Sequence, residues 1–417
     1  MHIWFVQTTD PSKLDSNNRL GRTEEMINIA LNSGHSVTRW TSTFDHFSKK
    51  NKYKKNHTKT FSNYKINYIY STGYKNNFSI NRYVKNLVLS YSLYKEFKKS
   101  TEKPNLIIVS FPIPEMAFLT TYFAKLRNIN VIVDVRDLWP DIIIEKFFFL
   151  KPLASIIFIP MRKINNYTFT NCSAIIGNSD QFIKWGIANA SKRKKTNLDT
   201  AFKMGFSNLS YKGSQYEIAK KYWQNQKISK KNNFLIASFF GTIGKNFDFD
   251  LILEAAKICE KKKINIKFIL CGNGSRLGEL IKKTKNLQNI LLTGWLNYSK
   301  IKYLNSISDF GLAPYIKTKN FSYNITNKIA EYMSGRNAIA TSLDKGILYQ
   351  LIKKYKCGFV YLSADDFTQK IFKLANNPKT LEKMKENSLK LYKSQLSSTK
   401  TYQSFHKYLN IFNNNQL

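Results

Sequence analysis

The stretch NITNKIAEYMSG, residues 324–335, decides the fold of this chain. Thr326 or Asn327 can cap a helix that ends at Gly335, and the apolar run 338–341 follows it as a strand. Similar pairs of helix and short apolar run recur along the chain. Strands that are apolar on both faces and that alternate with helices are typical of parallel α/β layers.

The same alternation predicts the elements of both halves. In the second half we expect strands at 234–240, 267–271, 290–293, 309–313 and 338–341, with helices at 250–259, 277–283, 298–305 and 327–334. In the first half we expect strands at 3–7, 37–40, 106–110, 131–135 and 174–178, with a helix at 23–32. A chain of 417 residues is too long for one ordinary core. We therefore predict two α/β domains, 1–205 and 206–390, followed by a C-terminal helix, 391–417, that packs back towards the first domain.

Two polar segments interrupt this pattern. Residues 47–64 are rich in Lys and Asn, and we expect them to form a long mobile loop. Residues 211–233 are partly helical in pattern and indicate the crossing between the two domains.

The composition is that of a globular and strongly basic protein. Hydrophobic residues make up 43% of the chain, and the formal net charge is +39. A charge of this size fits an anionic partner, either a nucleic acid or a membrane surface. Lys and Asn fill the loops from end to end, which also fits a simple compositional bias.

Neither a signal peptide nor a membrane span is expected. Residues 1–6 have the pattern of a first strand, and the nearest long apolar stretch, 142–160, is interrupted by Glu145, Lys146 and Lys151. The four cysteines show no metal or redox spacing, which indicates reduced, packed thiols in a cytoplasmic protein. They are Cys172, Cys259, Cys271 and Cys357.

Three glycine turns follow expected strands of the second half. Residues 240–245, FGTIGK, precede a helix; glycine there lets the main chain approach a phosphate, although a plain strand-to-helix turn has the same pattern. Residues 271–275, CGNGS, fit a turn that only starts a helix. At 293–296, TGWL, main-chain groups can meet the edge of a base, and Trp295 either shields that base or packs inside the fold.

The helix start within 324–335 is suited to a diphosphate. Main-chain amides and the helix dipole attract anions at such a terminus. Glu331 lies one turn inside, where a carboxylate can accept hydrogen bonds from both hydroxyls of a ribose. The alternative is a surface glutamate on an amphipathic helix.

Two loops of the first half carry charged groups at the expected ligand edge of the sheet. Residues 133–141, VDVRDLWPD, end a strand and place carboxylates and Arg136 there, unless Arg136 only forms a local salt bridge with its aspartates. In the loop 15–22, Arg19 and Arg22 can clamp a phosphate or simply start a solvated helix.

No metal site is expected. The motif DFD, residues 248–250, has the spacing of a metal-binding pair, but one of its aspartates can cap the helix that follows. The five histidines are scattered along the chain. The sequence shows no Walker loop and no plausible Ser-His-Asp set.

Together these elements resemble the retaining glycosyltransferase family 4, whose members have the GT-B fold of two Rossmann-like domains facing across a cleft. The closest likeness is to bacterial enzymes of O-antigen and capsule assembly. The resemblance covers nearly the whole chain except 47–64 and the last dozen residues, and it rests on the order and spacing of several motifs. The matching segments are 4–7, 16–19, 34–42, 134–141, 241–244, 294–296 and 327–335.

The resemblance implies that the second domain binds a UDP-sugar. Glu331 matches the ribose-binding glutamate of the family, and the other residues implied on the donor side are Gly241, Thr242, Lys245, Gly294, Trp295, Leu296, Asn327 and Lys328. Arg136 and Asp137 are implied as catalytic residues that face the sugar and the acceptor. Asn18, Arg19 and Arg22 are implied on the acceptor or phosphate side.

The chain departs from the family at three positions. Tyr323 stands where the family often has a second glutamate, so contact of a carboxylate with the sugar from that position is in doubt. Thr242 and Phe247 stand where it often has an arginine and a lysine beside the phosphate. Lys328 or Lys245 would then supply the missing charge, and the sequence does not choose between them.

The family implies a metal-independent hexosyl or N-acetylhexosaminyl transfer without a protein nucleophile. No cofactor is expected, because the UDP-sugar is a co-substrate. A polyprenyl-diphosphate-linked saccharide is the expected acceptor. The apolar residues 147–150 and 153–158, flanked by Lys and Arg, have the composition of an interfacial helix, or else of a core helix. We expect a cytoplasmic protein at the inner face of the cytoplasmic membrane.

Two rival functions are kept. A UDP-sugar 2-epimerase shares the two-domain fold, but it would need further acid and base groups near the sugar. A nucleic-acid-binding protein is suggested by charge alone, and it would need its basic residues in one stripe with stacking aromatics. Because lysine is spread evenly, we expect no nucleic-acid partner.

Overall fold

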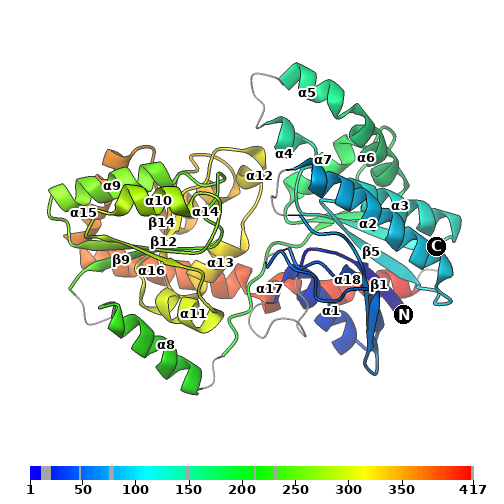
Figure 1. Ribbon diagram of the computed structural model, residues 1–417, viewed down its shortest axis with the longest axis horizontal. Coiled ribbons are helices and arrows are strands. Elements are labelled where there is room, and N and C mark those ends of the chain that lie inside the picture. Colours follow the sequence, from blue (N-terminus) through cyan, green and yellow to red (C-terminus); the bar gives the residue numbers. More distant parts are fainter. Residues whose placement is uncertain are drawn as a thin grey trace. The chain divides into compact units, whose positions relative to one another are not determined.

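The computed structural model describes residues 1–10, 20–46, 48–74, 79–145, 151–210, 213–229 and 233–414. The chain forms two compact units (Figure 1). Unit 1 comprises Met1–Lys203 and Tyr402–Leu417, and unit 2 comprises Met204–Thr401. The end of the chain thus belongs to the same unit as its beginning.

Unit 1 is built on an eight-stranded sheet with the order β3-β4-β2-β1-β5-β6-β7-β8. Neighbouring strands run parallel, except that β3 pairs antiparallel with β4 at the edge. The strands are β1 His2–Val6, β2 Ser36–Ser42, β3 His57–Thr60, β4 Tyr64–Ile69, β5 Leu106–Phe111, β6 Asn130–Val135, β7 Ala174–Gly177 and β8 Thr200–Ala201. The central strands are apolar because both of their faces are covered.

Helices cover both faces of this sheet. Alternate residues of a strand point to opposite faces. Ile3 and Phe5 therefore pack in one core with α1 and α18. Trp4 packs on the other side against Phe97 of α2 and Phe123 of α3, at 5.3 and 6.0 Å between ring centres. The helices are α1 Arg22–Asn32, α2 Ile80–Lys99, α3 Pro114–Leu126, α4 Asp141–Ile144, α5 Lys151–Ile157, α6 Ile159–Asn171, α7 Asp180–Ala188 and α18 Phe405–Asn414.

Unit 2 has a six-stranded, all-parallel sheet with the order β11-β10-β9-β12-β13-β14. The strands are β9 Leu235–Phe240, β10 Ile266–Cys271, β11 Ile290–Gly294, β12 Phe310–Ala313, β13 Ala338–Thr341 and β14 Gly358–Val360. Numbered within the unit, this order is 3-2-1-4-5-6, the order of the Rossmann fold. The direction of winding reverses between β9 and β12, and ligands of such sheets bind where the carboxyl ends of those two strands diverge.

Two cores sandwich the sheet of unit 2. One contains α9, α10 and α15, and the other contains α8, α11, α13, α14 and the end of α16. The helices are α8 Gly213–Asn225, α9 Phe249–Lys261, α10 Leu277–Thr284, α11 Tyr298–Ile307, α12 Lys319–Ser322, α13 Asn327–Ser334, α14 Ile347–Tyr355, α15 Ala364–Ala375, α16 Pro378–Leu391, a π-helical turn Tyr392–Leu396, and α17 Ser398–Tyr402.

Two sequence-based expectations are wrong. The stretch 47–64, expected as a mobile loop, contains β3, whose residues His57 to Thr60 pair with β4. The stretch 211–233, expected to be partly helical and to form the interdomain crossing, does contain its helix as α8, but α8 is part of the core of unit 2. Trp223 of that helix is fully buried, and its indole nitrogen donates a hydrogen bond to the carbonyl of Lys300 at 2.8 Å.

Two other expectations concern the thiols and the membrane. All four cysteines are buried and free, as packed thiols should be. In the described part of the chain, no helix combines the length and the apolar character needed to cross a bilayer.

Candidate nucleotide-sugar site

Glycine turns follow the three neighbouring strands β9, β10 and β11 of unit 2. The main-chain nitrogen of Gly241 donates to the carbonyl of Cys271 at 2.9 Å, and that of Gly272 donates to the carbonyl of Gly294 at 2.7 Å. Gly272 has a φ of +147°, and a side chain there would overlap the carbonyl oxygen of Gly241. Glycine is therefore required at this position. The motif 271–275 thus does more than start a helix, because it supports the turn at Gly241.

Tyr332 of α13 fills the gap between β9 and β12. These strands pair only at Phe310 and Gly311, and then separate. The hydroxyl of Tyr332 accepts from the main-chain nitrogen of Phe240 at 3.4 Å and donates to the carbonyl of Leu312 at 3.0 Å. A side chain at Gly311 would collide with the tyrosine ring. Gly311 and Tyr332 therefore seat α13 across the switch point of the sheet.

Helix α13 places the side chain of Lys328 against the turn at Gly241. The ammonium of Lys328 donates to the carbonyl of Phe240 at 2.5 Å and lies over the rings of Phe239 and Phe247, at 4.5 and 5.3 Å from their centres. A side chain at Gly241 would meet that ammonium. Lys245 is instead exposed. Of the two lysines left open by the sequence, Lys328 is the one that lies against the turn.

The start of α13 is also fixed by side chains. Thr326 is its N-cap residue, and its hydroxyl is hydrogen-bonded to that of Tyr315 at 2.5 Å. Glu331, one turn further on, is only 3% exposed. A surface glutamate on an amphipathic helix is thereby excluded for this position.

The turn after β11 presents an uncovered aromatic ring. Trp295 is 70% exposed, so of the two roles considered for it, packing inside unit 2 is not observed. Leu296 packs against the core beside α11. Thr242 is exposed, Asn327 is half-buried, and Phe247 lies in an aromatic cluster with Tyr315 at 5.5 Å between ring centres.

Arg136 and Arg22 of unit 1 form a buried charge network. Arg136 donates to Asp10 at 2.6 Å, to Asp134 at 2.8 Å and to Thr23 at 2.8 Å. Arg22, with a fully buried side chain, pairs with Asp134 at 3.0 Å and also donates to the carbonyl of Phe202. The local salt bridge considered for Arg136 is thus present, and Arg22 does not begin a solvated helix.

The network sets the charge state of its carboxylates. Burial alone would raise the pKa of Asp134, but Arg22 and Arg136 outweigh it and hold that pKa below its ordinary value. The pKa of Asp10 is lowered in the same way, chiefly by Arg136 acting against burial. Both aspartates are therefore ionised at neutral pH.

The remaining site residues named from the sequence are placed as follows. Asp137 is half-buried next to Arg136. Asn18 and Arg19 lie outside the described residues. Asp248 caps α9 by accepting from the main-chain nitrogen of Leu251 at 3.1 Å, and Asp250 pairs with Arg276 and Lys283 at 2.6 and 2.7 Å.

Sequence reasoning missed Gly311 and Tyr332. A lone glycine inside an apolar strand is a signal of close approach by another element, so Gly311 could have been singled out. No local signal marks Tyr332, because its hydroxyl finds both partners on distant strands.

Comparisons with known proteins agree with this architecture. Residues 221–391 match the family model described as glycosyl transferases group 1. No curated protein sequence matches the chain. Among solved structures, a sucrose-phosphate synthase from Thermosynechococcus elongatus is 12% identical, with a TM-score of 0.69 and full coverage of both chains.

Two further structures have similar scores. The Anabaena protein HepE in complex with UDP and glucose is 13% identical, with a TM-score of 0.66, covering 99% of this chain and 100% of that one. WaaG, a glycosyltransferase involved in lipopolysaccharide biosynthesis, is 12% identical, with a TM-score of 0.67 and the same coverage. The chain thus has the GT-B fold of glycosyltransferases, and residues 221–391 of its second unit match glycosyl transferases group 1.

Proposed function

We propose that the chain is a retaining glycosyltransferase of family 4, which transfers a hexosyl or N-acetylhexosaminyl group from a UDP-sugar to a polyprenyl-diphosphate-linked saccharide during assembly of a surface polysaccharide such as O-antigen or capsule. The observation that carries the proposal is the arrangement at the switch point of unit 2. There Lys328, the start of α13 and the turn at Gly241 converge, with the buried Glu331 one turn behind.

In this proposal each part of the arrangement has one task. The turn at Gly241 and the start of α13 receive the diphosphate, since helix termini and glycine turns offer main-chain amides to phosphate. Lys328 neutralises it, which compensates for the threonine and phenylalanine at positions 242 and 247. Glu331 holds the ribose, and main-chain groups at Trp295 and Leu296 meet the base.

In this proposal the reaction proceeds with retention. The bond between the anomeric carbon and the diphosphate breaks while the acceptor oxygen bonds to the same face of that carbon. The acceptor proton passes to the departing diphosphate oxygen. Lys328 and the helix amides stabilise the negative charge that develops on the diphosphate. In unit 1, Asp137 is proposed to face the acceptor, whereas Arg136, held by Asp10, Asp134 and Thr23, positions the loop that carries Asp137.

The decisive experiment is a substrate panel. The purified protein is incubated with individual UDP-sugars and a polyprenyl-diphosphate-linked sugar, and the products are identified by mass spectrometry and by the configuration of the new linkage. We expect UDP release that depends on the acceptor, and a retained anomeric configuration. Conversion of a UDP-sugar into its 2-epimer without any acceptor would replace this proposal by the epimerase.

The transfer should not need a divalent metal. Asp250 is occupied by Arg276 and Lys283, and Asp248 caps α9, so neither carboxylate is set up to hold a cation at the diphosphate. We expect the rate of UDP release to stay within about twofold of its starting value after treatment with excess EDTA. Loss of activity that magnesium or manganese restores would contradict this expectation.

We further propose that unit 1 docks on the inner face of the cytoplasmic membrane, and the outer surface of α2 supports this. Apolar side chains at helical spacing on this surface are exposed by 39–82%; they are Ile80, Tyr83, Val84, Leu87, Val88 and Tyr91. At 100° per residue they fall within an arc of roughly 140°. The buried side of the same helix carries the apolar residues Leu89, Leu93 and Phe97 together with the polar residues Lys85, Asn86 and Ser90.

Charge favours an anionic lipid surface over a second protein molecule as the occupant of this face. The apolar stripe continues into the exposed Lys95, Lys98 and Lys99. The acidic side chains of α2 and of its neighbour α3, which are both fully described, are the half-buried Glu96 and the buried Glu115. An amphipathic helix with basic flanks lies in the plane of a bilayer interface. On α5, Leu153, Ile156 and Ile157 are more than half exposed, whereas residues 147–150 lie outside the described residues.

Membrane binding should depend on these side chains. We expect the triple variant Val84→Asn, Leu87→Asn, Val88→Asn to bind vesicles of phosphatidylglycerol and phosphatidylcholine at least tenfold more weakly than the wild type, because each buried apolar side chain contributes on the order of 1 kcal/mol or more. High salt should release the wild type. Co-sedimentation measures both effects.

The matched control is Ile218→Asn with Phe372→Asn, two apolar residues of unit 2 exposed by 63 and 54%. It should bind vesicles like the wild type. Equal binding by both variants would contradict the assignment of α2. A wild-type dimer that the triple variant dissociates, seen by analytical ultracentrifugation, would show that a second copy covers this face instead.

A further inference from the structure

Three cationic side chains of unit 1 surround one aromatic ring. The ammonium of Lys49 lies 4.5 Å from the centre of the Tyr74 ring, the guanidinium of Arg82 lies 5.5 Å from it, and the ammonium of Lys85 lies 5.6 Å from it. Lys49 follows β2, Tyr74 follows β4, and the other two belong to the first turns of α2. Like charges repel, so bringing these three side chains together is costly, and a bound anion would lower that cost.

Lys85 is the member of this group that most requires an explanation. It is only 4% exposed, on the side of α2 that faces the sheet. In the described part of the chain its ammonium contacts the rings of Phe44 and Tyr74, at 5.5 and 5.6 Å from their centres, and has no hydrogen bond or ion pair. An isolated buried ammonium is costly unless a partner is supplied. A lysine kept there thus points to a ligand that brings the negative charge.

The surroundings of the group favour an anion rather than a cation or a neutral molecule. Burial, together with Arg82 and Lys49, lowers the pKa of Lys85 to about 8, and burial with the same cations lowers the pKa of His46 to about 4. At pH 7, Lys85 is therefore still mostly protonated, whereas His46 is neutral. Asp45 is a carboxylate close to this group; it pairs with Lys52 at 3.6 Å, and its negative charge also acts on Lys49.

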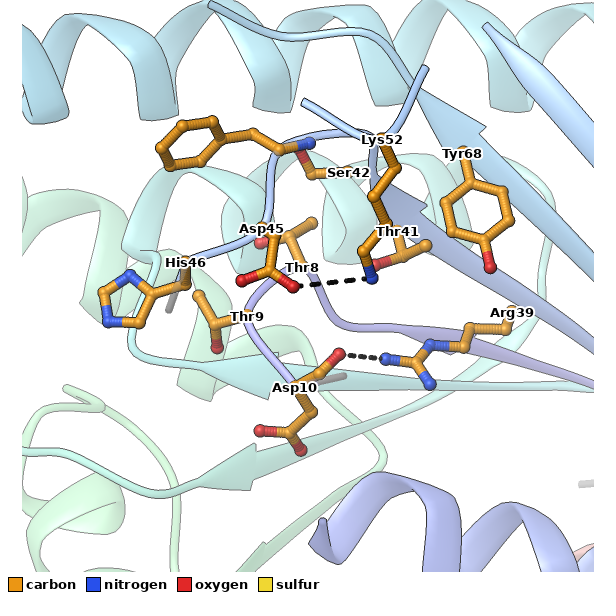
Figure 2. Close-up of a pocket in the computed structure, with 11 residues that line it drawn as sticks. Thr8, Thr9, Asp10, Arg39, Thr41, Ser42, Asp45, His46, Lys52 and Tyr68 are labelled. Atoms are coloured by element: carbon orange, nitrogen blue, oxygen red, sulfur yellow. Dashed lines mark hydrogen bonds and ion pairs between the residues drawn. The ribbon is translucent and has the colours of Figure 1, made fainter. Parts of the chain in front are cut away.

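The group lies on the ligand edge of the parallel sheet of unit 1. A pocket lined mainly by polar side chains from the carboxyl ends of β1 and β2 lies beside it (Figure 2). Its lining includes Phe44, whose ring contacts the ammonium of Lys85, and His46, on which all three cations act. Figure 2 shows Thr9 and Ser42 among the residues that line this pocket. The guanidinium of Arg82 also lies 5.8 Å from the centre of the Trp139 ring. Trp139 belongs to the loop that carries Asp137.

We propose that Lys49, Arg82 and Lys85 form a binding site for a phosphate-class dianion, and that its ligand is the diphosphate of the acceptor substrate. The assignment to the acceptor rests on the proposed function, whereas the anion site itself does not. Lysine and arginine are the side chains that bind phosphate oxygens most strongly.

The test is calorimetric titration of the full chain with inorganic pyrophosphate in saturating UDP, which occupies the phosphate site of unit 2. We expect one mole of pyrophosphate to bind per mole of wild type. Lys85→Met, which replaces a buried charge with an apolar side chain of similar length, should lower the affinity at least tenfold, and so should Arg82→Gln. The matched control is Lys98→Gln, an exposed lysine on the same helix, which should bind like the wild type.

If Lys85→Met, Arg82→Gln and Lys98→Gln all bind pyrophosphate with the same affinity, or if the wild type does not bind it, the proposed anion site is wrong. If Lys85→Met does not fold by circular dichroism, Arg82→Gln against Lys98→Gln decides alone. Farnesyl diphosphate and phosphatidylglycerol vesicles separate the sources of the anion. Competition with pyrophosphate by farnesyl diphosphate supports the acceptor diphosphate, whereas competition by the vesicles alone would overturn that assignment. This experiment measures binding and not sugar transfer. The pyrophosphate affinities can therefore be interpreted even if the proposed transfer reaction is wrong.

Discussion

Replacing Asp134 by asparagine is expected to lower the free energy of unfolding of unit 1 by about 3–5 kcal/mol, the usual cost of removing one partner of a buried ion pair. The side chain of Asp134 is 1% exposed and accepts hydrogen bonds from Arg22 and Arg136, which are 0 and 11% exposed. Asparagine keeps the shape but leaves the guanidinium of Arg22 without a carboxylate. The carbonyls of Phe202 and Lys203 then remain its acceptors.

The loss can be measured by differential scanning calorimetry. For a unit of this size, it corresponds to a melting temperature lower by about 6–20 °C. The matched control is Asp180→Asn, the same chemical change at an exposed aspartate in the first turn of α7. A change there should cost under about 1 kcal/mol, because only a helix-dipole contact is lost. Equal melting of the two variants would show that the network contributes nothing beyond surface charge.

The pH dependence follows from the direction of the pKa shift. The pKa of Asp134 in the folded chain lies below its ordinary value, despite burial, because of Arg22 and Arg136. Its contribution to stability is therefore complete above the unfolded value of about 3.9, and it is lost as the pH falls through the folded pKa. The difference in stability between wild type and Asp134→Asn should be constant near neutral pH and shrink below about pH 4.

The buried α/β elements could be predicted from the sequence because their burial pattern is local. The helix Asn327–Ser334 and the strand Ala338–Thr341 have the bounds that the sequence indicates, and β10 differs by one residue. A strand buried on both faces must be apolar throughout, and a glycine or a cap residue marks where the next helix starts or ends. These signals need no knowledge of distant contacts.

The polar elements could not be predicted in this way. The strand β3 reads HTKT and lies at the edge of its sheet, so it needs no apolar face. The helix α8 buries only Ala219 and Trp223. Two buried residues in thirteen give a weak helical period, and the surrounding lysines and glutamines make such a segment resemble a linker.

In the candidate site, too, features with a local sequence pattern could be predicted, and features that depend on distant contacts could not. The turns at Gly241 and Gly272 were visible because a glycine after a buried strand is a local pattern. Whether an arginine binds a ligand or another side chain depends on distant residues, and Arg22 and Asp134 are 112 positions apart in the sequence. Lys85 was not singled out, because only the packing of α2 shows that this lysine faces inward.

Replacing Glu331 by glutamine is expected to lower kcat/KM about 30- to 150-fold, which corresponds to a loss of roughly 2–3 kcal/mol of binding to the nucleotide. A carboxylate that accepts hydrogen bonds from both ribose hydroxyls makes charge-assisted bonds worth about 1.5–3 kcal/mol each. Glutamine keeps the volume of a side chain that is 3% exposed, so the chain should still fold. It loses the charge and offers only one good acceptor oxygen.

The kinetic constants show where the carboxylate acts. If the ribose is held equally in the ground state and in the transition state, the loss falls on KM for the donor; if the grip orients the diphosphate for departure, it falls on kcat. The protection that UDP gives against thermal unfolding should also shrink, since stabilisation by a ligand follows its affinity. That readout does not depend on the acceptor.

The matched control for this variant is Glu254→Gln on α9, an exposed glutamate on the helix layer opposite α13. It should leave both kcat/KM and the protection by UDP unchanged. If Glu331→Gln behaves like this control, the buried carboxylate does not bind ribose, and the placement of the nucleotide along α13 is wrong. If it loses transfer but keeps the full protection by UDP, Glu331 acts after the donor has bound, and the ribose contact must be made by another group of unit 2.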